Sequence, residues 1–371
     1  MSEPSSQAWV FSSRGLPWHV LSLTTRPTPT LPPPLPLPRD VPSPEEWLLV
    51  KTAFVGLNPG AIFQMTLIPP FVRQPTCVPE MDFSGTVVDV WHPDGEAAAR
   101  FRTGDKVAAM LPASHTVPTG SGALAEYVRV PARYVVKKPE SASLGDAAGC
   151  LLPGLTAWEL VSEVREGHRV LVNAASGGIG TLVVQMVRKI VGDKGYVVGI
   201  CSGKNAEMVK SLGADEVIDY TQHKSLPAHL TSLFSSNPFN VIIDTLGHQA
   251  LYLSSPSYLT PTGPYVSVGI KPPTFFVPDF LRAVVQMKLN EWWPTSRWLG
   301  GVGRRWVAVA MMSPTLEDRQ RIIDMLGAGD IKLVRDSVWP FEQTKEAYEK
   351  LGGLHARGKV LVKVDSSVGD D

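Results

Sequence analysis

The feature that most constrains this chain is a glycine-rich loop between a buried strand and a helix. Residues 170–180 read VLVNAASGGIG, so an apolar run passes directly into small residues. Small residues let the backbone approach a pyrophosphate, and the start of the following helix offers that anion free N–H groups and a partial positive charge. The pattern predicts dinucleotide binding, with an ordinary tight turn as the alternative. The residues expected at the phosphates are Ser176, Gly177, Gly178, Ile179 and Gly180.

The next strand indicates which dinucleotide is bound. A strand that reads NAD usually ends in Asp or Glu, which binds the ribose 2′-hydroxyl. Here the strand expected over Tyr196–Cys201 is followed by Ser202, Gly203, Lys204 and Asn205. A hydroxyl and a cation without a nearby acid suit a 2′-phosphate, so this segment predicts NADPH. The alternative is a surface lysine at the start of a helix.

The order of the expected elements indicates the fold class. Strand-like and helix-like segments alternate after about residue 141, which is typical of a parallel sheet with helices on both faces. Residues from about 47 to about 136 contain short β-branched runs bounded by turns, which favours a small barrel-like domain. The prediction is an α/β protein with a Rossmann doubly wound parallel sheet and a β-barrel domain. The expected strands after residue 141 are Arg169–Asn173, Tyr196–Cys201, Glu216–Asp219, Val241–Asp244 and Tyr265–Gly269, and the expected helices are Gly178–Val191, Asn205–Leu212, Leu316–Leu326 and Phe341–Leu351.

Two segments leave their place in the fold open. A final strand over Lys359–Val364 could complete the parallel sheet or return to the first domain, and spacing alone does not decide. The proline-rich stretch Pro27–Pro44 is expected to be extended surface chain, because proline fixes φ and removes a hydrogen-bond donor. A long loop between strands is the favoured interpretation, and a docking site for a proline-reading partner is the alternative.

Composition excludes several classes of protein. Lys and Arg number 35, as do Asp and Glu, and this zero net charge argues against nucleic acid or an anionic membrane as a partner. No apolar run reaches the length of a membrane span, and the N-terminus lacks the pattern of a secretory signal. Cys77, Cys150 and Cys201 have neither metal-ligand nor redox-motif spacing, which suits a reducing compartment. We therefore expect a cytoplasmic protein.

Short motifs in a fixed order give the chain a family resemblance. It resembles the medium-chain dehydrogenase/reductase superfamily, in the zinc-independent branch of quinone oxidoreductases and enoyl reductases. The resemblance implies a GroES-like β-barrel catalytic domain over residues 1–140, a Rossmann domain over 141–300, and a segment 301–371 that returns to the catalytic domain. The motifs that carry it are Gly56–Pro59, Asp82–Gly85, Gly104–Val107, Gly122–Tyr127, Leu155–Trp158, the glycine loop, Leu212–Tyr220 and Ala356–Val360.

The resemblance also implies roles for single residues. Residues that match Ser202, Lys204 and Tyr220 surround the 2′-phosphate in similar enzymes, and those that match Asn58 and Thr156 lie near the nicotinamide. The remaining cofactor groove is expected to contain Leu246, Gly269, Ile270 and Lys359.

The expected metal content is none. Where the zinc-dependent branch has Gly-His-Glu, this chain has Met81-Asp82-Phe83, and no catalytic cysteine stands near Gly56-Leu57-Asn58. Three protein ligands are needed for a catalytic zinc, and His92 and His115 are isolated histidines. The chain also departs from relatives that read Asn-Pro-x-Asp-x-Lys, because residues 58–64 read NPGAIFQ and contain neither the acid nor the lysine, while Gln64 can donate a hydrogen bond but not an acidic proton. The proton donor is therefore unassigned, with water as a candidate.

The sequence predicts an NADPH-dependent reductase that transfers hydride to an activated C=C bond, with a trans-acting enoyl reductase as the specific expectation. A quinone oxidoreductase is the alternative within enzymes, and a reductase-like scaffold protein is the alternative of another class. The expected partner is a small hydrophobic substrate, free or carrier-bound, with no nucleic acid and no membrane; the chain is expected to be a monomer or a homodimer. Four tryptophans could line a substrate pocket or a dimer face, or could simply pack an insert; they are Trp292, Trp293, Trp298 and Trp306.

Overall fold

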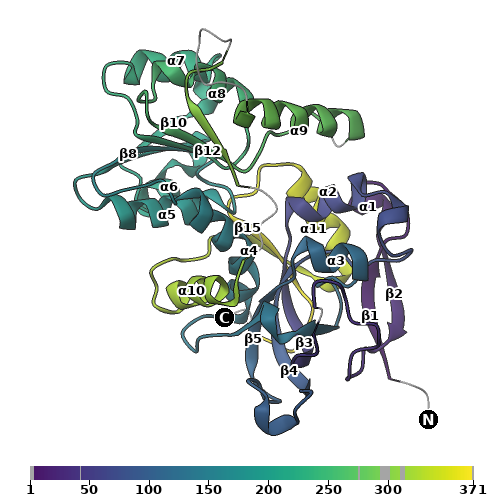
Figure 1. The fold of residues 1–371 in the computed structure, drawn as a ribbon. Coiled ribbons are helices and arrows are strands. Elements are labelled where there is room, and N and C mark those ends of the chain that lie inside the picture. The colour runs from purple at the N-terminus through teal and green to yellow at the C-terminus, as the bar shows by residue number, and fades with distance from the viewer. Residues whose placement is uncertain (1–3, 42, 275, 293–300, 310–313, 370–371) are drawn as a thin grey trace. The chain divides into compact units, whose positions relative to one another are not determined.

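The computed structural model describes residues 4–41, 43–274, 276–292, 301–309 and 314–369. These residues form two compact units, and each is described by itself (Figure 1). The first unit is Met1–Leu155 with Ser313–Asp371, and the second is Thr156–Met312.

The second unit is built on one parallel sheet of six strands in the order β10-β9-β8-β11-β12-β13. All of its neighbouring strands run parallel, and the chain order reverses direction between β8 and β11. This is the doubly wound arrangement predicted from the alternation of elements. The strands are β8 (Arg169–Asn173), β9 (Tyr196–Cys201), β10 (Glu216–Asp219), β11 (Val241–Asp244), β12 (Pro264–Ser267) and β13 (Arg305–Ala308).

Helices cover both faces of this sheet. In Figure 1, α5 and α6 lie on one face, and α7 and α8 lie on the other. Helix α5 begins at Gly180, two residues later than predicted, because Ala174–Ile179 form the loop instead. The residues predicted as one helix from Asn205 form a 3₁₀ turn followed by α6. The helices are α5 (Gly180–Val191), α6 (Ala206–Ser211), α7 (Leu226–Phe234), α8 (Gln249–Ser254) and α9 (Val277–Trp292).

An aromatic cluster fills the core beside β12. Tyr265 stacks on Trp306 with ring centroids 5.2 Å apart, and Tyr252 meets both rings edge-on. Trp306 is therefore a core residue of the sheet. Trp292, at the end of α9, is 77% exposed. Trp293 and Trp298 lie outside the described residues, so the prediction of a pocket or dimer face remains a prediction.

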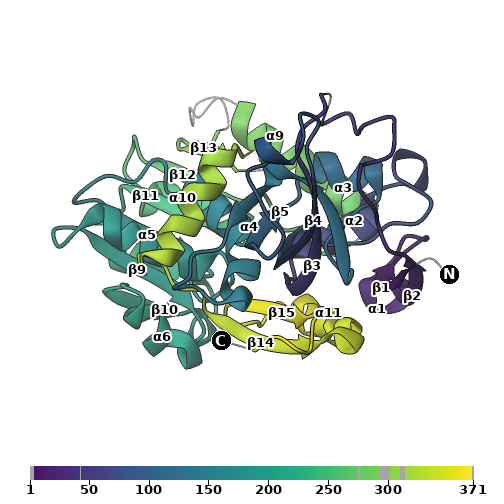
Figure 2. The same ribbon diagram turned by 90° about the horizontal axis from the view of Figure 1, so that it is seen from below.

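The first unit is built on a sheet in the order β14-β15-β3-β4-β5-β7, with β6 paired to β3. Its strands are antiparallel except for the β14–β15 pair. Strand β15 pairs with β3, which answers the question that spacing left open: the C-terminal strand returns to the first unit (Figure 2). The strands are β3 (Trp47–Gly56), β4 (Asp82–Trp91), β5 (Lys106–Met110), β6 (Tyr127–Pro131), β7 (Val135–Lys137), β14 (Arg335–Pro340) and β15 (Lys359–Lys363), with a separate hairpin of β1 (Ser5–Val10) and β2 (Ser22–Pro27).

The remaining helices pack around this sheet or lead into the second unit. Helix α4 has a proline at position 153, inside its span, and its last residues belong to the second unit. Helix α10 begins with a capping box, in which the Thr315 and Asp318 side chains satisfy each other's backbone N–H groups. The helices are α1 (Pro17–Val20), α2 (Pro59–Leu67), α3 (Ala113–Thr119), α4 (Leu144–Leu160), α10 (Leu316–Gly327) and α11 (Thr344–Gly352). The described residues of both units also form short 3₁₀ turns, which are Pro70–Val72, Glu96–Ala98, Ala132–Tyr134, Gly203–Asn205, Tyr220–Gln222, Ser255–Ser257 and Phe341–Gln343.

The proline-rich stretch is a long loop between β2 and β3, as predicted. It is held to the barrel by Asp40, whose Oδ2 accepts from Tyr134 Oη at 2.6 Å and lies 2.9 Å from His115 Nδ1. Although burial opposes the change, hydrogen bonds from His115 and Tyr134 lower the pKa of Asp40. Among the described residues, no helix is both long and apolar enough to cross a membrane.

Candidate active site

The glycine loop departs from extended backbone at Ala174, immediately after β8. Ala174 has φ +55°, and its carbonyl accepts the N–H of Gly177 at 3.0 Å, which closes a tight turn. A Cβ atom added to Gly180 would lie 2.1 Å from that carbonyl oxygen, so only glycine fits where α5 begins. A Cβ on Gly177 would come no closer than 3.4 Å to the same atom. Gly180 is thus needed by the fold itself, whereas no atom of the described residues crowds a Cβ at Gly177.

Asn205 joins this loop to the end of β9. Its Nδ2 donates to Ser176 Oγ at 3.1 Å and to Ser202 Oγ at 3.2 Å, and the Asn205 side chain is buried. Three residues predicted to bind the cofactor, Ser176, Ser202 and Asn205, are therefore joined by the side-chain amide of Asn205. The loop contains the half-buried Gly178 and Ile179 as well, so the structure brings this part of the predicted set together.

Lys204 and Tyr220 follow neighbouring strands. Cys201 pairs with Asp219, so the turns after β9 and β10 emerge side by side. Both side chains are exposed, and Lys204 forms no ion pair with any carboxylate in the described part of the chain. Asp219, an acid that the sequence analysis did not place here, lies beside these residues. Its Oδ2 is so close to Gly203 that a Cβ atom on that glycine would lie 2.4 Å from it.

The Asp219 carboxylate is engaged within its own turn. Oδ1 accepts from the backbone N and the Oγ1 of Thr221, at 3.0 and 2.7 Å. Both hydrogen bonds lower the pKa of Asp219, and the one from the Thr221 side chain has the larger effect. The acid is therefore ionised at neutral pH and satisfied by its own turn, and Lys204 remains the exposed cation at this corner.

Asp244 orders the loops after β11 and β12. Its fully buried carboxylate accepts from Asn173 Nδ2, from Tyr265 Oη and from the backbone N–H groups of residues 246–248, at 2.6–3.0 Å. Gly247 and Gly269 have φ of +83° and +126°, and Lys271 N donates to the Gly247 carbonyl at 2.9 Å.

The predicted groove residues Leu246, Gly269 and Ile270 lie in these two loops, at the carboxyl ends of adjacent strands. Ligands of such sheets bind at this edge. Thr156 lies buried in α4, at the start of the second unit.

In the first unit, Asn58 and Lys359 meet directly. Lys359 Nζ donates to Asn58 Oδ1 at 2.5 Å, and both side chains are buried. Asn58 Nδ2 donates to the Gly56 carbonyl at 2.7 Å and to Glu80 Oε2 at 3.0 Å. Both amide hydrogens of Asn58 are therefore used inside the protein, which leaves only a lone pair on Oδ1.

Two buried acids complete this cluster. Glu80 Oε1 accepts from Asn58 N at 2.9 Å and from Tyr348 Oη at 2.8 Å. Asp82 Oδ2 accepts from Leu152 N at 3.3 Å, while its Oδ1 has no partner within the described chain. Burial raises the pKa of Glu80 and raises that of Asp82 further, and it lowers the pKa of Lys359.

No group of three His, Cys, Asp or Glu residues in the described ranges is close enough to hold a metal. His115 is a core residue bound to Asp40, and His92 Nδ1 accepts from Asp94 N at 3.1 Å. The absence of zinc stays a prediction. Gln64 has its Nε2 3.5 Å from both Met81 Sδ and Thr116 Oγ1, which is at the limit of a hydrogen bond.

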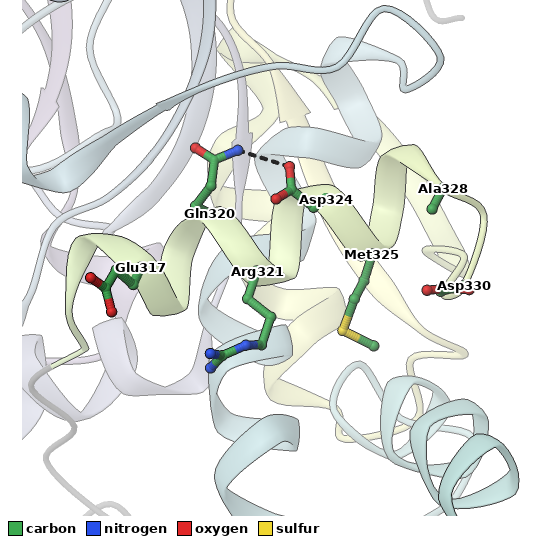
Figure 3. A pocket seen from close by; sticks show the side chains of 7 residues that line it. All are labelled: Glu317, Gln320, Arg321, Asp324, Met325, Ala328 and Asp330. Carbon is green, nitrogen blue, oxygen red and sulfur yellow. Dashed lines mark hydrogen bonds between the residues drawn. The ribbon is translucent and has the colours of Figure 1, made fainter.

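Two of the hollows in the described part of the first unit differ greatly in size. The larger is an open hollow of about 450 Å³ on α10, lined mainly by charged and polar side chains (Figure 3). Its lining is unlike the apolar lining of small-molecule sites. The smaller, beside Gln64 and Arg73, has about 10 Å³, which is room for about one water molecule.

Sequence reasoning missed Glu80, Asp219, Asp244 and Tyr348 as site residues. Asp244 and Asp219 each end a strand that was predicted correctly, so the signal was an acid at the carboxyl end of a parallel strand. Glu80 and Asp82 stand two apart just before a buried strand, which is a weaker signal. Nothing in the sequence marks Tyr348.

Comparisons with known proteins extend over nearly the whole chain. Residues 44–140 match the family described as alcohol dehydrogenase GroES-like domain, and residues 212–362 match the family described as zinc-binding dehydrogenase. The chain is 35% identical to the medium chain reductase pydE of Acremonium sp over 352 residues, which cover 89% of this chain and 93% of the relative. It is 29% identical to the trans-enoyl reductase poxH of Penicillium oxalicum, covering 96% and 97%.

A human relative and a solved structure agree with these matches. The human mitochondrial NAD(P)H oxidoreductase RTN4IP1 is 31% identical over 76% of this chain and 69% of its own length. A mycobacterial protein solved in complex with NADPH shares the fold, with a TM-score of 0.72 and 20% identity over 97% of this chain and all of that one. The chain thus belongs to the medium-chain dehydrogenase/reductase superfamily and is an NAD(P)H-dependent oxidoreductase.

Proposed function

We propose that the protein is an NADPH-dependent reductase of activated C=C bonds in α,β-unsaturated carbonyl compounds. The observation that carries the cofactor half of this proposal is the corner after β9. Lys204 is exposed there without an ion pair in the described chain, and Ser202 Oγ is held by Asn205. Asp219, the acid beside it, accepts two hydrogen bonds from Thr221 in its own turn. A cation with a hydroxyl favours a 2′-phosphate over a free ribose hydroxyl.

The glycine loop fits the pyrophosphate of such a nucleotide. Gly177 leaves space at the start of α5, where free N–H groups and the helix dipole favour an anion. Leu246, Gly269 and Ile270 would line the groove along the same edge of the sheet. When bound, the nicotinamide supplies hydride to an electron-poor carbon.

The side chains around Asn58 support reduction of an activated bond rather than oxidation of a simple alcohol. Alcohol oxidation in this family relies on a metal-stabilised alkoxide, and this chain has Met81-Asp82-Phe83 where the zinc-dependent branch has its Gly-His-Glu set. An enone needs only orientation and hydrogen bonding for the charge that moves onto its carbonyl oxygen. Gln64 has no acidic proton to give, so we assign the proton to water.

The choice of an enoyl substrate rests on relatives named as medium chain and trans-enoyl reductases. The test is turnover of NADPH and of NADH with an enone, an enoyl thioester and a quinone, using NADPH deuterated at C4. We expect deuterium at the β-carbon of the enone or thioester product and a preference for NADPH. Turnover with the quinone alone would replace this proposal by a quinone oxidoreductase, and cofactor binding without any turnover would favour the scaffold alternative.

A further inference from the structure

Glu80 adopts a backbone conformation that glutamate rarely takes. Its φ is +73°, in the left-handed region that suits glycine, and its side chain is fully buried. Both the backbone strain and the burial of a carboxyl group cost free energy. Residues held against such costs concentrate at functional sites. The carboxylate of Glu80 therefore needs an account that the fold alone does not give.

Glu80 decides which way the Asn58 amide points. Oε2 of Glu80 and the carbonyl of Gly56 both accept from Asn58 Nδ2, so the nitrogen must face these two acceptors. The oxygen of the amide then faces Lys359, whose Nζ donates to it. With a neutral or donating group in place of the carboxylate, the opposite amide orientation would become accessible, and it would present N–H groups to an ammonium.

Glu80 also supplies negative charge to the cluster. The groups that act on Lys359 on β15 are Asn58 before α2, Glu80 two residues before β4, Asp82 at the start of β4, and Cys150 in α4, while Tyr348 in α11 binds Glu80. Burial lowers the pKa of Lys359, and the charges of Asp82 and Glu80 oppose this.

The hydrogen bonds decide which acid carries that charge. Glu80 has three donors on its carboxylate, whereas Asp82 has one oxygen without a partner in the described chain. Hydrogen bonds from donors stabilise the ionised form. Glu80 is therefore the better anion of the two acids.

We propose that Glu80 is a positioning residue for cofactor binding: through Asn58 it fixes the Lys359 ammonium and keeps it charged for the nicotinamide dinucleotide. The proposal rests on the proposed function and on the sequence-based expectation that Lys359 binds the cofactor. In this proposal Glu80 acts through Asn58 and Lys359 and not by contact with the cofactor. Its effect should therefore appear in how cofactor affinity depends on pH, which a purely structural role would not change.

The experiment measures the NADPH dissociation constant by fluorescence titration from pH 6 to 10 for wild type, Glu80→Gln and Glu80→Gly. Glu80→Gly removes the carboxylate while it relieves the left-handed backbone, so it should fold even where Glu80→Gln does not. We expect the affinity of wild type to stay flat to a higher pH than that of either variant, because both variants should lose affinity, approaching tenfold per pH unit, above a lowered lysine pKa. Glu317→Gln removes an exposed carboxylate of α10 that lies outside this cluster, and it should stay close to wild type.

A second measurement reports on the lysine without the cofactor. Proteins labelled with ¹³C at the lysine Cε are titrated by NMR, and Lys359→Met assigns the signal. The signal should titrate at lower pH in Glu80→Gln than in wild type. Parallel affinity profiles together with an unmoved NMR titration would overturn the role of Glu80 even if wild type binds NADPH. A wild type without NADPH affinity would instead reject the proposed function and the cofactor part of this proposal with it.

Discussion

Replacing Gly180 by alanine separates the structural from the ligand-binding glycines of the loop. At an ordinary helix position, Gly→Ala stabilises by about 1 kcal/mol. Here the new Cβ would lie 2.1 Å from the Ala174 carbonyl oxygen and 2.9 Å from the Ala174 carbonyl carbon, both of which are backbone. Backbone cannot rotate away as a side chain can, so we expect an overpacking cost of about 1–3 kcal/mol that reverses the usual sign.

Gly177→Ala is the matched control, because the same methyl group there would meet its nearest atom at 3.4 Å, an ordinary contact. Urea unfolding should show lower stability for Gly180→Ala and nearly unchanged stability for Gly177→Ala. Fluorescence titration with NADPH should show weaker binding for Gly177→Ala, since its methyl group points into the space left for phosphate. A Gly180→Ala protein as stable as wild type would refute the packing argument, and undiminished NADPH affinity in Gly177→Ala would refute the phosphate assignment.

Three further predictions test other parts of the molecule. Lys204→Ala should weaken NADPH binding by roughly tenfold and leave NADH binding nearly unchanged, whereas Lys210→Ala, whose lysine pairs with Glu207, should change neither; equal losses for both cofactors would contradict the 2′-phosphate assignment. Exhaustive chelation should leave turnover intact, and a stoichiometric zinc lost together with activity would overturn this expectation. Asp40→Asn should destabilise the protein by about 1.5 kcal/mol at neutral pH. Because the folded pKa of Asp40 is lowered, this difference in stability should persist above about pH 4 and vanish as the pH falls through the folded pKa. Urea unfolding of wild type and variant between pH 2 and 7 measures it.

The parallel strands were predictable because burial on both faces leaves an unbroken apolar run. Four of them, Arg169–Asn173, Tyr196–Cys201, Glu216–Asp219 and Val241–Asp244, have the predicted bounds. Helix starts were less predictable. The two-residue error at Gly180 arises because the left-handed Ala174 sets the length of the loop, and alanine carries no signal for that conformation.

Contacts between distant residues set the limit of prediction for the site. Asn58 and Lys359 are 301 residues apart, and their hydrogen bond depends on the return of β15 to pair with β3. Spacing could not decide that return. Asp219 shows a milder case: its strand was predicted, but only the register that pairs it with Cys201 places an acid beside the turn that was described as lacking one.

The same contacts limit the hydrogen bonds that the Asn58 amide can make to a cofactor or substrate. From the sequence, its amide offered donors and an acceptor to a nicotinamide or to a substrate oxygen. In the folded chain, the Gly56 carbonyl and Glu80 take both amide hydrogens, and Lys359 takes one lone pair of the oxygen. A remaining role toward the cofactor is therefore that of an acceptor, which suits the N–H groups of a carboxamide and does not suit a developing enolate oxygen. Stabilisation of that oxygen must then come from a donor other than Asn58. Binding of the nicotinamide carboxamide and stabilisation of the substrate oxygen are therefore carried out by different groups.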